Sequence, residues 1–296
     1  DSEEELLFRY ASLHWSIPVS SGYGRRLRFL VFDENNGKLI GLFGLGDPVF
    51  SLKDRDEWIG WDRDAKRSRM YHLMDAFVLG AVPPYSRLLC GKLIAMLALS
   101  SEVQEAFRSK YSDHVSLIKK ERREPILALL TTTSALGKSS IYNRIRVDGF
   151  DYWTSAGFTQ GSGEFHFSND VYAKMRSYVE ANCKPTAKHN DWGTGFRNRR
   201  EVIRKCLSSL GLSSSLIYHG IRREIFVAPL GVKALEFLRG ETADPCLYTW
   251  PANHLAGLFR DRWLLPRAAR NVSYQDFAND EYILWPKLPA VEEENH

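Results

Sequence analysis

Four side chains within six residues could carry out chemistry together: Ser139, Tyr142, Asn143 and Arg144. A tyrosine hydroxyl can donate a proton, and an arginine can neutralise a developing negative charge. We therefore interpret this cluster as a candidate catalytic site, with Tyr142 as the acid. The alternative is structural, with Tyr142 packed against the core and its hydroxyl at the rim.

The segment that leads into this cluster, Thr131–Ser139, ends like a phosphate-binding P-loop. That motif needs a glycine five positions before Gly137, where the backbone wraps the phosphates, and Thr132 stands there instead. An NTP-binding P-loop is therefore excluded. Two interpretations remain for the helix expected from Ser139: Ser139 or Ser140 caps it, or its first N–H groups hold an anion.

A second turn, Pro83–Lys92, carries the candidate cofactor-binding residues Arg87, Gly91 and Lys92. It links a predicted buried strand to a predicted helix, a position where many α/β folds bind anionic cofactors on backbone amides. Gly91 could equally serve close packing alone. The sequence identifies no particular cofactor.

The elements that must position these two turns follow from hydrophobic patterning. The nearly continuous apolar run Met74–Val82 predicts a central strand buried on both faces, and Ile126–Thr132 predicts another. Leu27–Phe32 and Lys38–Leu45 predict paired strands around a turn, and Ser86–Leu99 predicts a helix. If the two central strands are parallel neighbours, the turns that follow them meet at one sheet edge and share a pocket.

The glycine-rich segment Gly157–Phe167 has two interpretations. It predicts a bulged hairpin, or it places Glu164 or His166 in a cleft as an acid or base. The other histidines are scattered without an HExxH pattern, so no metal site is expected. The four cysteines lie far apart without a CxxC pair, which favours a reduced, cytoplasmic protein.

Basic residues are concentrated in one part of the chain. The formal net charge is only +4, but residues 181–240 contain eleven Lys or Arg against four Asp or Glu. This excess predicts a surface that contacts nucleic-acid phosphates. The alternative is a charged surface that faces solvent and binds no partner. The predicted DNA-binding residues are Arg197, Arg199, Arg200, Arg204, Arg222 and Arg223.

The succession of strands, turns and helices up to about residue 180 favours an α/β (α+β) core, followed by a basic helical C-terminal region. The predicted division is therefore 1–182 and 183–296, with one continuous fold as the alternative. Composition is that of a globular protein, with 44% hydrophobic and 12% aromatic residues. Because no run of eighteen apolar residues exists, a membrane span and a membrane partner are not expected.

Taken together, long stretches of the sequence resemble the DruA-like family of Druantia anti-phage systems. The resemblance covers about Arg25–Ala269 and is carried by Asp56–Trp61, Met74–Lys92, Thr131–Arg144, Gly157–Phe167, Tyr218–Pro229 and Phe237–Gly240. It implies a role in phage defence beside other proteins of the system, such as a helicase-like subunit, and it does not imply a particular reaction.

The core also resembles GNAT-type N-acyltransferases, which implies a GNAT-like mixed sheet flanked by helices. Those enzymes bind the pyrophosphate of acyl-CoA at a glycine-containing turn after a central strand, and a later tyrosine often acts as the acid. Gly91 matches part of that turn and Tyr142 could take the acid role, but Cys90 and Lys92 stand where small residues are expected.

Three functions remain open from the sequence. The first is a DNA-modifying or DNA-processing enzyme that uses a GNAT-like cleft, and the second is a non-catalytic DNA-recognition subunit of a defence complex. The third is an N-acyltransferase for a small molecule, which explains the core but not the basic region. The polar cluster around Tyr142 favours the first function, and the incomplete glycine turn favours the second.

Overall fold

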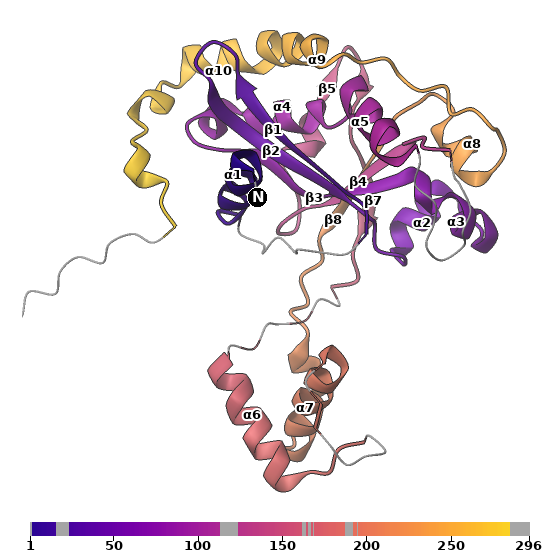
Figure 1. Cartoon of the computed structure of the whole chain (residues 1–296), viewed down its shortest axis with the longest axis vertical. Coiled ribbons are helices and arrows are strands. Elements are labelled where there is room, and N and C mark those ends of the chain that lie inside the picture. The colour runs from indigo at the N-terminus through magenta and orange to yellow at the C-terminus, as the bar shows by residue number, and fades with distance from the viewer. Residues whose placement is uncertain are drawn as a thin grey trace, which may run out of the picture. The chain divides into compact units, whose positions relative to one another are not determined.

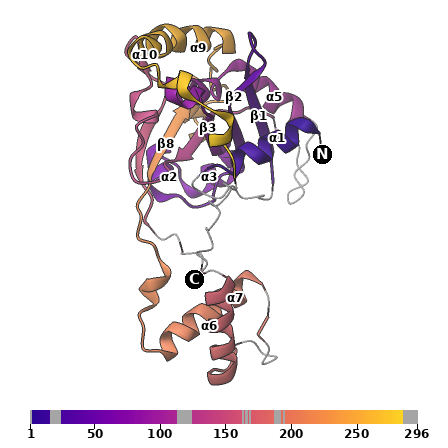
Figure 2. The ribbon, with the colours of Figure 1, turned by 90° about the vertical axis from the view of Figure 1, so that its left-hand side faces the viewer.

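The chain folds into two compact units, shown in Figures 1 and 2. The core unit comprises residues 1–158 and 224–296, and the inserted unit comprises residues 159–223. The structure is a computed structural model, and it describes residues 2–15, 24–112, 124–161, 164, 167, 169–186, 192–193 and 195–284.

A six-stranded mixed sheet forms the centre of the core unit. The strands lie in the order β1-β2-β3-β4-β8-β7, where β3 and β4 are parallel and all other neighbours are antiparallel. Their bounds are β1 Arg26–Asp33, β2 Lys38–Gly46, β3 Leu73–Ala81, β4 Leu129–Thr133, β7 Thr154–Phe158 and β8 Glu224–Pro229. The predicted mixed α/β architecture, the β1–β2 pair and the central strand are thus confirmed.

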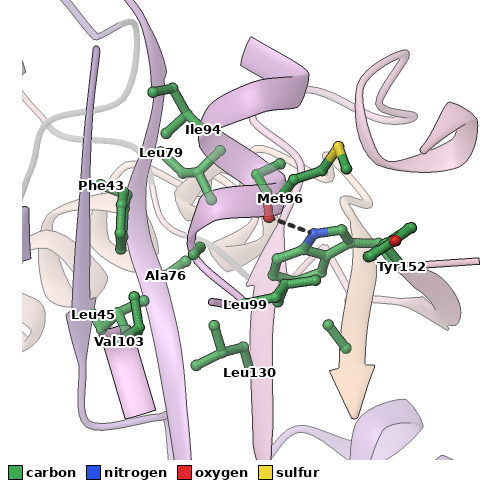
Figure 3. Packing of buried hydrophobic residues seen from close by; sticks show 14 of the residues in the cluster. Phe43, Leu45, Ala76, Leu79, Ile94, Met96, Leu99, Val103, Leu130 and Tyr152 are labelled. Carbon is green, nitrogen blue, oxygen red and sulfur yellow. Dashed lines mark hydrogen bonds between the residues drawn. The ribbon is translucent and has the colours of Figure 1, made fainter. Parts of the chain in front are cut away.

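Helices cover both faces of this sheet because its strands are apolar on both sides. Neighbouring residues alternate between faces, as in β3, where Val78 packs with the helix α1 and Leu79 packs with α4. Figure 3 shows Leu79 beside Ile94 of α4. The helices of the core unit are α1 Glu3–Ser12, α2 Lys53–Ile59, α3 Arg63–Arg69, α4 Cys90–Leu97, α5 Ser101–Tyr111, α8 Ala234–Arg239, α9 Ala252–Phe259 and α10 Leu265–Arg270.

Two predicted helices differ from the structure. The helix expected over Ser86–Leu99 is a 3₁₀ turn, Tyr85–Leu88, followed by α4, because Leu89 between them has a left-handed backbone (φ 63°). The helix expected from Ser139 is only the 3₁₀ turn Tyr142–Arg144. Here the Ser139 hydroxyl accepts the Ile141 N–H (3.1 Å), a local bond that competes with helical pairing. A two-stranded hairpin follows, β5 Arg146–Val147 with β6 Phe150–Asp151.

The unit boundaries also differ from the predicted division at residue 182. Residues 224–229 form β8, which pairs with β4 and β7 inside the core sheet, so the C-terminal region does not form a unit of its own. The inserted unit instead begins after β7 and ends before β8. It contains α6 Asn169–Asn182 and α7 Phe196–Ser209, which pack together around Met175, Val179, Val202, Ile203, Cys206, Leu207 and Ile217.

The close approach of β2 and β3 yields a test of the fold. A Cβ added at Gly41 would lie 2.4 Å from the Gly80 carbonyl oxygen and 2.8 Å from the Ala81 Cα. We expect Gly41→Ala to lower the free energy of unfolding by about 1–3 kcal/mol, because these backbone atoms cannot move apart without breaking the pairing. Urea denaturation of the purified protein measures the change.

The matched control is Gly257→Ala in α9. Nothing lies within 4 Å of a Cβ at Gly257, and alanine is the better helix former. This substitution should leave the free energy of unfolding unchanged or raise it by up to about 1 kcal/mol. Equal effects of the two substitutions would contradict the predicted clash between β2 and β3.

Candidate functional site

The two polar turns predicted to share a site contact each other in the structure. β3 and β4 pair in parallel from Leu73 with Leu129 to Asp75 with Thr131, so the turns that follow them leave at the same sheet edge. The Lys92 ammonium donates to the Ile141 carbonyl oxygen at 3.0 Å. A Cβ at Gly91 would lie 3.2 Å from the Ile141 Cδ1, so this glycine serves the close packing of the two turns.

Lys92 is a buried cation that joins these turns rather than an open anion site. Burial and, to a smaller extent, the nearby positive charge of Arg144 lower the pKa of its ammonium to about 8. Besides the Ile141 carbonyl, the ammonium contacts the Ser140 carbonyl oxygen (3.5 Å) and lies 5.8 Å from the Trp263 ring centre. The two backbone carbonyls accept hydrogen bonds that a cofactor phosphate would otherwise receive.

Tyr142 lies in the core and not at its rim. Only 7% of the residue is exposed, and its ring packs between Trp153 and Phe226, at 5.2 and 4.9 Å between centres. Burial raises the pKa of its hydroxyl to about 12, although a hydrogen bond with Thr132 acts in the opposite direction. An acid must touch the group that it protonates, so in this position Tyr142 stabilises the core.

The remaining members of the cluster form a local network around Glu224. The Asn143 amide donates to the Ser139 carbonyl (2.9 Å) and to the buried Glu224 carboxylate (3.3 Å). The Glu224 N–H in turn donates to the Ser134 hydroxyl (2.9 Å), which fixes this turn against the start of β8. Arg144 is exposed beside the network.

Arg87, the third predicted cofactor-binding residue, anchors the C-terminal part of the core unit. Its guanidinium donates to the Ser273 carbonyl (2.7 Å) and lies 5.9 Å from the Phe277 ring centre. The Arg267 side chain donates to the Arg87 carbonyl oxygen (3.0 Å). His166, predicted as an acid or base, lies outside the residues that the structure describes.

The inserted unit holds the predicted DNA-binding arginines, and they differ in what they contact. Arg199 donates to the Phe167 carbonyl (3.0 Å) and stacks on the Tyr172 ring (4.3 Å). Arg197 and Arg204 are exposed on α7, and no ion pair joins either to a carboxylate among the described residues. These two guanidiniums are therefore available to an outside partner.

Arg200 lies between them and is bound by Glu164. Its guanidinium donates to both carboxylate oxygens, at 2.7 and 2.9 Å from Nε, and 42% of its side chain remains exposed. This contact lowers the pKa of Glu164, so the carboxylate is fully charged at neutral pH and is not poised as an acid. No sequence pattern identifies this pair, because its members lie 36 residues apart.

The two arginines before β8 contribute differently. Arg222 is exposed, whereas Arg223 is half-buried and its backbone pairs with Thr159. The inserted unit as a whole contains eleven Lys or Arg against five Asp or Glu, so it carries an excess of six positive charges and the core unit is slightly negative. The basic excess thus belongs to one compact unit.

Within the residues that the structure describes, no group of three or more His, Cys, Asp or Glu could hold a metal ion. In the same residues, no helix is long and apolar enough to cross a membrane.

Sequence comparison identifies the family. The pattern of the family described as Druantia protein DruA matches residues 1–240. The chain belongs to this family. It is also 43% identical to a Druantia protein DruA from Escherichia coli (strain UMEA 4076-1), over 96% of this chain and 73% of that protein. Membership of the DruA family is consistent with anti-phage defence.

No solved structure matches the chain, so the likeness to GNAT-type enzymes stays a prediction. The structure shows how the sequence segments that carry the resemblance to the DruA-like family are arranged. Several of them contact each other: the Trp61 indole donates to the Leu238 carbonyl (2.6 Å), and the Thr131 hydroxyl donates to the Asp75 carboxylate (2.8 Å). These family-like stretches therefore hold the core unit together.

The position of Tyr142 yields a prediction that opposes the catalytic interpretation. We expect Tyr142→Phe to lower the free energy of unfolding by about 1 kcal/mol, because one buried hydrogen bond is lost while ring packing remains. Protection in a phage-plating assay should match that of the unsubstituted protein once expression is equalised. Loss of protection with an unchanged melting temperature would instead establish a catalytic role for the hydroxyl.

Proposed function

We propose that this DruA family member acts in anti-phage defence as a DNA-recognition subunit, and that it contacts phosphates through the exposed face of α7. The observation that carries this proposal is the pair of exposed guanidiniums of Arg197 and Arg204, which form no ion pair among the described residues. They are separated by two helical turns and therefore lie on the same side of the helix. Cationic groups on one face of a basic unit are the electrostatic feature on which DNA binding depends.

Neither of the other two functions has comparable support. The predicted acid, Tyr142, is buried, and the predicted cofactor-binding side chains of Arg87 and Lys92 donate to backbone carbonyls. A cofactor or small-molecule substrate would have to displace these internal contacts. We therefore assign recognition to this chain, and processing of the DNA to partners in the defence system such as a helicase-like subunit.

Removing the two exposed charges tests the proposal directly. We expect Arg197→Gln with Arg204→Gln to weaken binding to a duplex oligonucleotide about tenfold or more at 0.1 M salt. The plot of the logarithm of the binding constant against the logarithm of the salt concentration should become shallower, its slope decreasing in magnitude by about two. Each lost phosphate contact removes about one released counterion. Fluorescence anisotropy measures both quantities, and the variant should also lose protection in phage plating.

The control removes the same number of charges from the core unit. Arg63 and Arg67 are exposed on α3, and Arg63→Gln with Arg67→Gln gives the same net charge. This control should bind DNA like the unsubstituted protein. Arg199 and Arg200 are unsuitable for the test because they make internal contacts, with the Phe167 carbonyl and the Glu164 carboxylate. Absence of DNA binding at low salt would refute the proposal.

Breaking the Glu164–Arg200 pair should strengthen DNA binding, whereas removing Arg197 and Arg204 should weaken it. Because the lowered pKa of Glu164 keeps the carboxylate charged at neutral pH, Glu164→Gln removes a negative charge beside α7 and releases Arg200. We expect DNA affinity to rise severalfold and the salt slope to increase by about one contact. Anisotropy titrations at several salt concentrations provide the measurement.

Glu180→Gln is the matched control, since Glu180 pairs with Arg176 on α6 of the same unit. It changes the net charge by the same amount at a place that lies off the α7 face. An equal gain in affinity from both substitutions would show that only the net charge of the inserted unit matters.

A further inference from the structure

The uncovered side of α7 has the dimensions and residue types of a helix that enters the major groove of duplex DNA. α7 packs against α6 and the turn Ser214–Ile217 through Val202, Ile203, Cys206 and Leu207. The opposite side presents Arg197, Arg200, Arg204 and Ser208, with Glu201 half-buried among them. One side of the helix is therefore fixed in a small core, and the other exposes Arg197 and Arg204.

The length of α7 suits this groove. Its fourteen residues span about 21 Å, and the major groove, about 12 Å wide, admits a single helix. Arg197 and Arg204 are seven residues apart, or about 10 Å along the axis. That distance corresponds to about three base-pair steps of DNA, so the two guanidiniums reach different base pairs of one site.

The type of cation on this side of α7 favours hydrogen bonds to the edges of the bases in addition to contacts with phosphates. The exposed cations are arginines, whereas the one lysine of α7, Lys205, pairs with Glu201 and lies over Trp192. Arginine donates two parallel hydrogen bonds to the O6 and N7 atoms of guanine, the commonest specific contact in the major groove. A lysine serves equally well for phosphate but lacks this planar fork.

The other residues on this side of α7 do not hinder the approach of the helix to DNA. The Glu201 carboxylate already accepts the Thr186 N–H (2.6 Å) and the Lys205 ammonium (3.0 Å), so its charge is compensated inside the unit. Ser208 is small, and its position on the exposed side allows the end of the helix to approach the bases closely. Arg200, held by Glu164, lies between the exposed Arg197 and Arg204 along the helix.

We propose that α7 is a major-groove recognition helix for duplex DNA, in which Arg197 and Arg204 each contact a guanine. The inference rests on the proposed function, since it requires that this face binds DNA. It adds three specifications to that function: the nucleic acid is a duplex, the helix lies in the major groove, and the base contacted is guanine. Single-stranded nucleic acid and minor-groove binding are the outcomes that it excludes.

Methylation interference tests the groove. A duplex selected from a random pool by the purified full chain is treated with dimethyl sulfate, which methylates guanine N7 in the major groove and adenine N3 in the minor groove. We expect guanine methylation within the site to deplete the bound fraction, and adenine methylation to have no effect. Interference at adenine N3 alone, or equal affinity for the single strands, would overturn the inference while leaving DNA binding intact.

Charge-preserving substitutions test the two arginines. Arg197→Lys with Arg204→Lys keeps both positive charges but removes the planar guanidinium fork of each side chain. Preference for the selected duplex over the random one should fall about tenfold or more, since lysine lacks the planar fork and each guanine contact is weakened. An unchanged preference would overturn guanine readout, whereas no binding by the unsubstituted chain to any duplex would refute the proposed function itself.

Discussion

The structure depends on the pairing of β7 with β8, two neighbouring strands that are separated by the entire inserted unit. Directly beyond them, the Thr159 N–H donates to the Arg223 carbonyl (2.8 Å) and the Arg223 N–H donates to the Thr159 hydroxyl (2.9 Å). The chain thus leaves and re-enters the sheet at one place. The entropic cost of closing a loop grows only slowly with its length. A unit of this size can therefore be inserted between β7 and β8 while the two strands stay paired.

This constraint separates the two sets of polar residues that the sequence offers. The cluster around Tyr142 and the turn at Arg87 belong to the core unit, whereas the arginines of α7 belong to the inserted unit. In the core unit, burial determines what polar groups can do. A charged or hydroxyl group removed from water must find an internal partner, and Lys92 and Tyr142 have done so.

Arginines show the same principle in both units. Arg55 is fully buried, and it donates to the Val49 and Phe50 carbonyls and pairs with Asp56, so it fixes the loop before α2. Arg204 forms no ion pair among the described residues and stays exposed to solvent. The residue type is the same, but its surroundings decide between a structural crosslink and a contact for a partner. Counting basic residues in the sequence cannot separate these roles.

The sequence alone determined the mixed α/β class, the central strand near Met74–Val82 and a basic helical region after residue 182, because hydrophobic periodicity is local. It also identified the DruA-like family, from long stretches that proved to contact each other in the core. Only the tertiary structure decided that β8 returns to the core sheet, that Tyr142 is buried and that Glu164 binds Arg200. Each of these depends on contacts between residues far apart in the chain, for which the sequence contains no periodic signal.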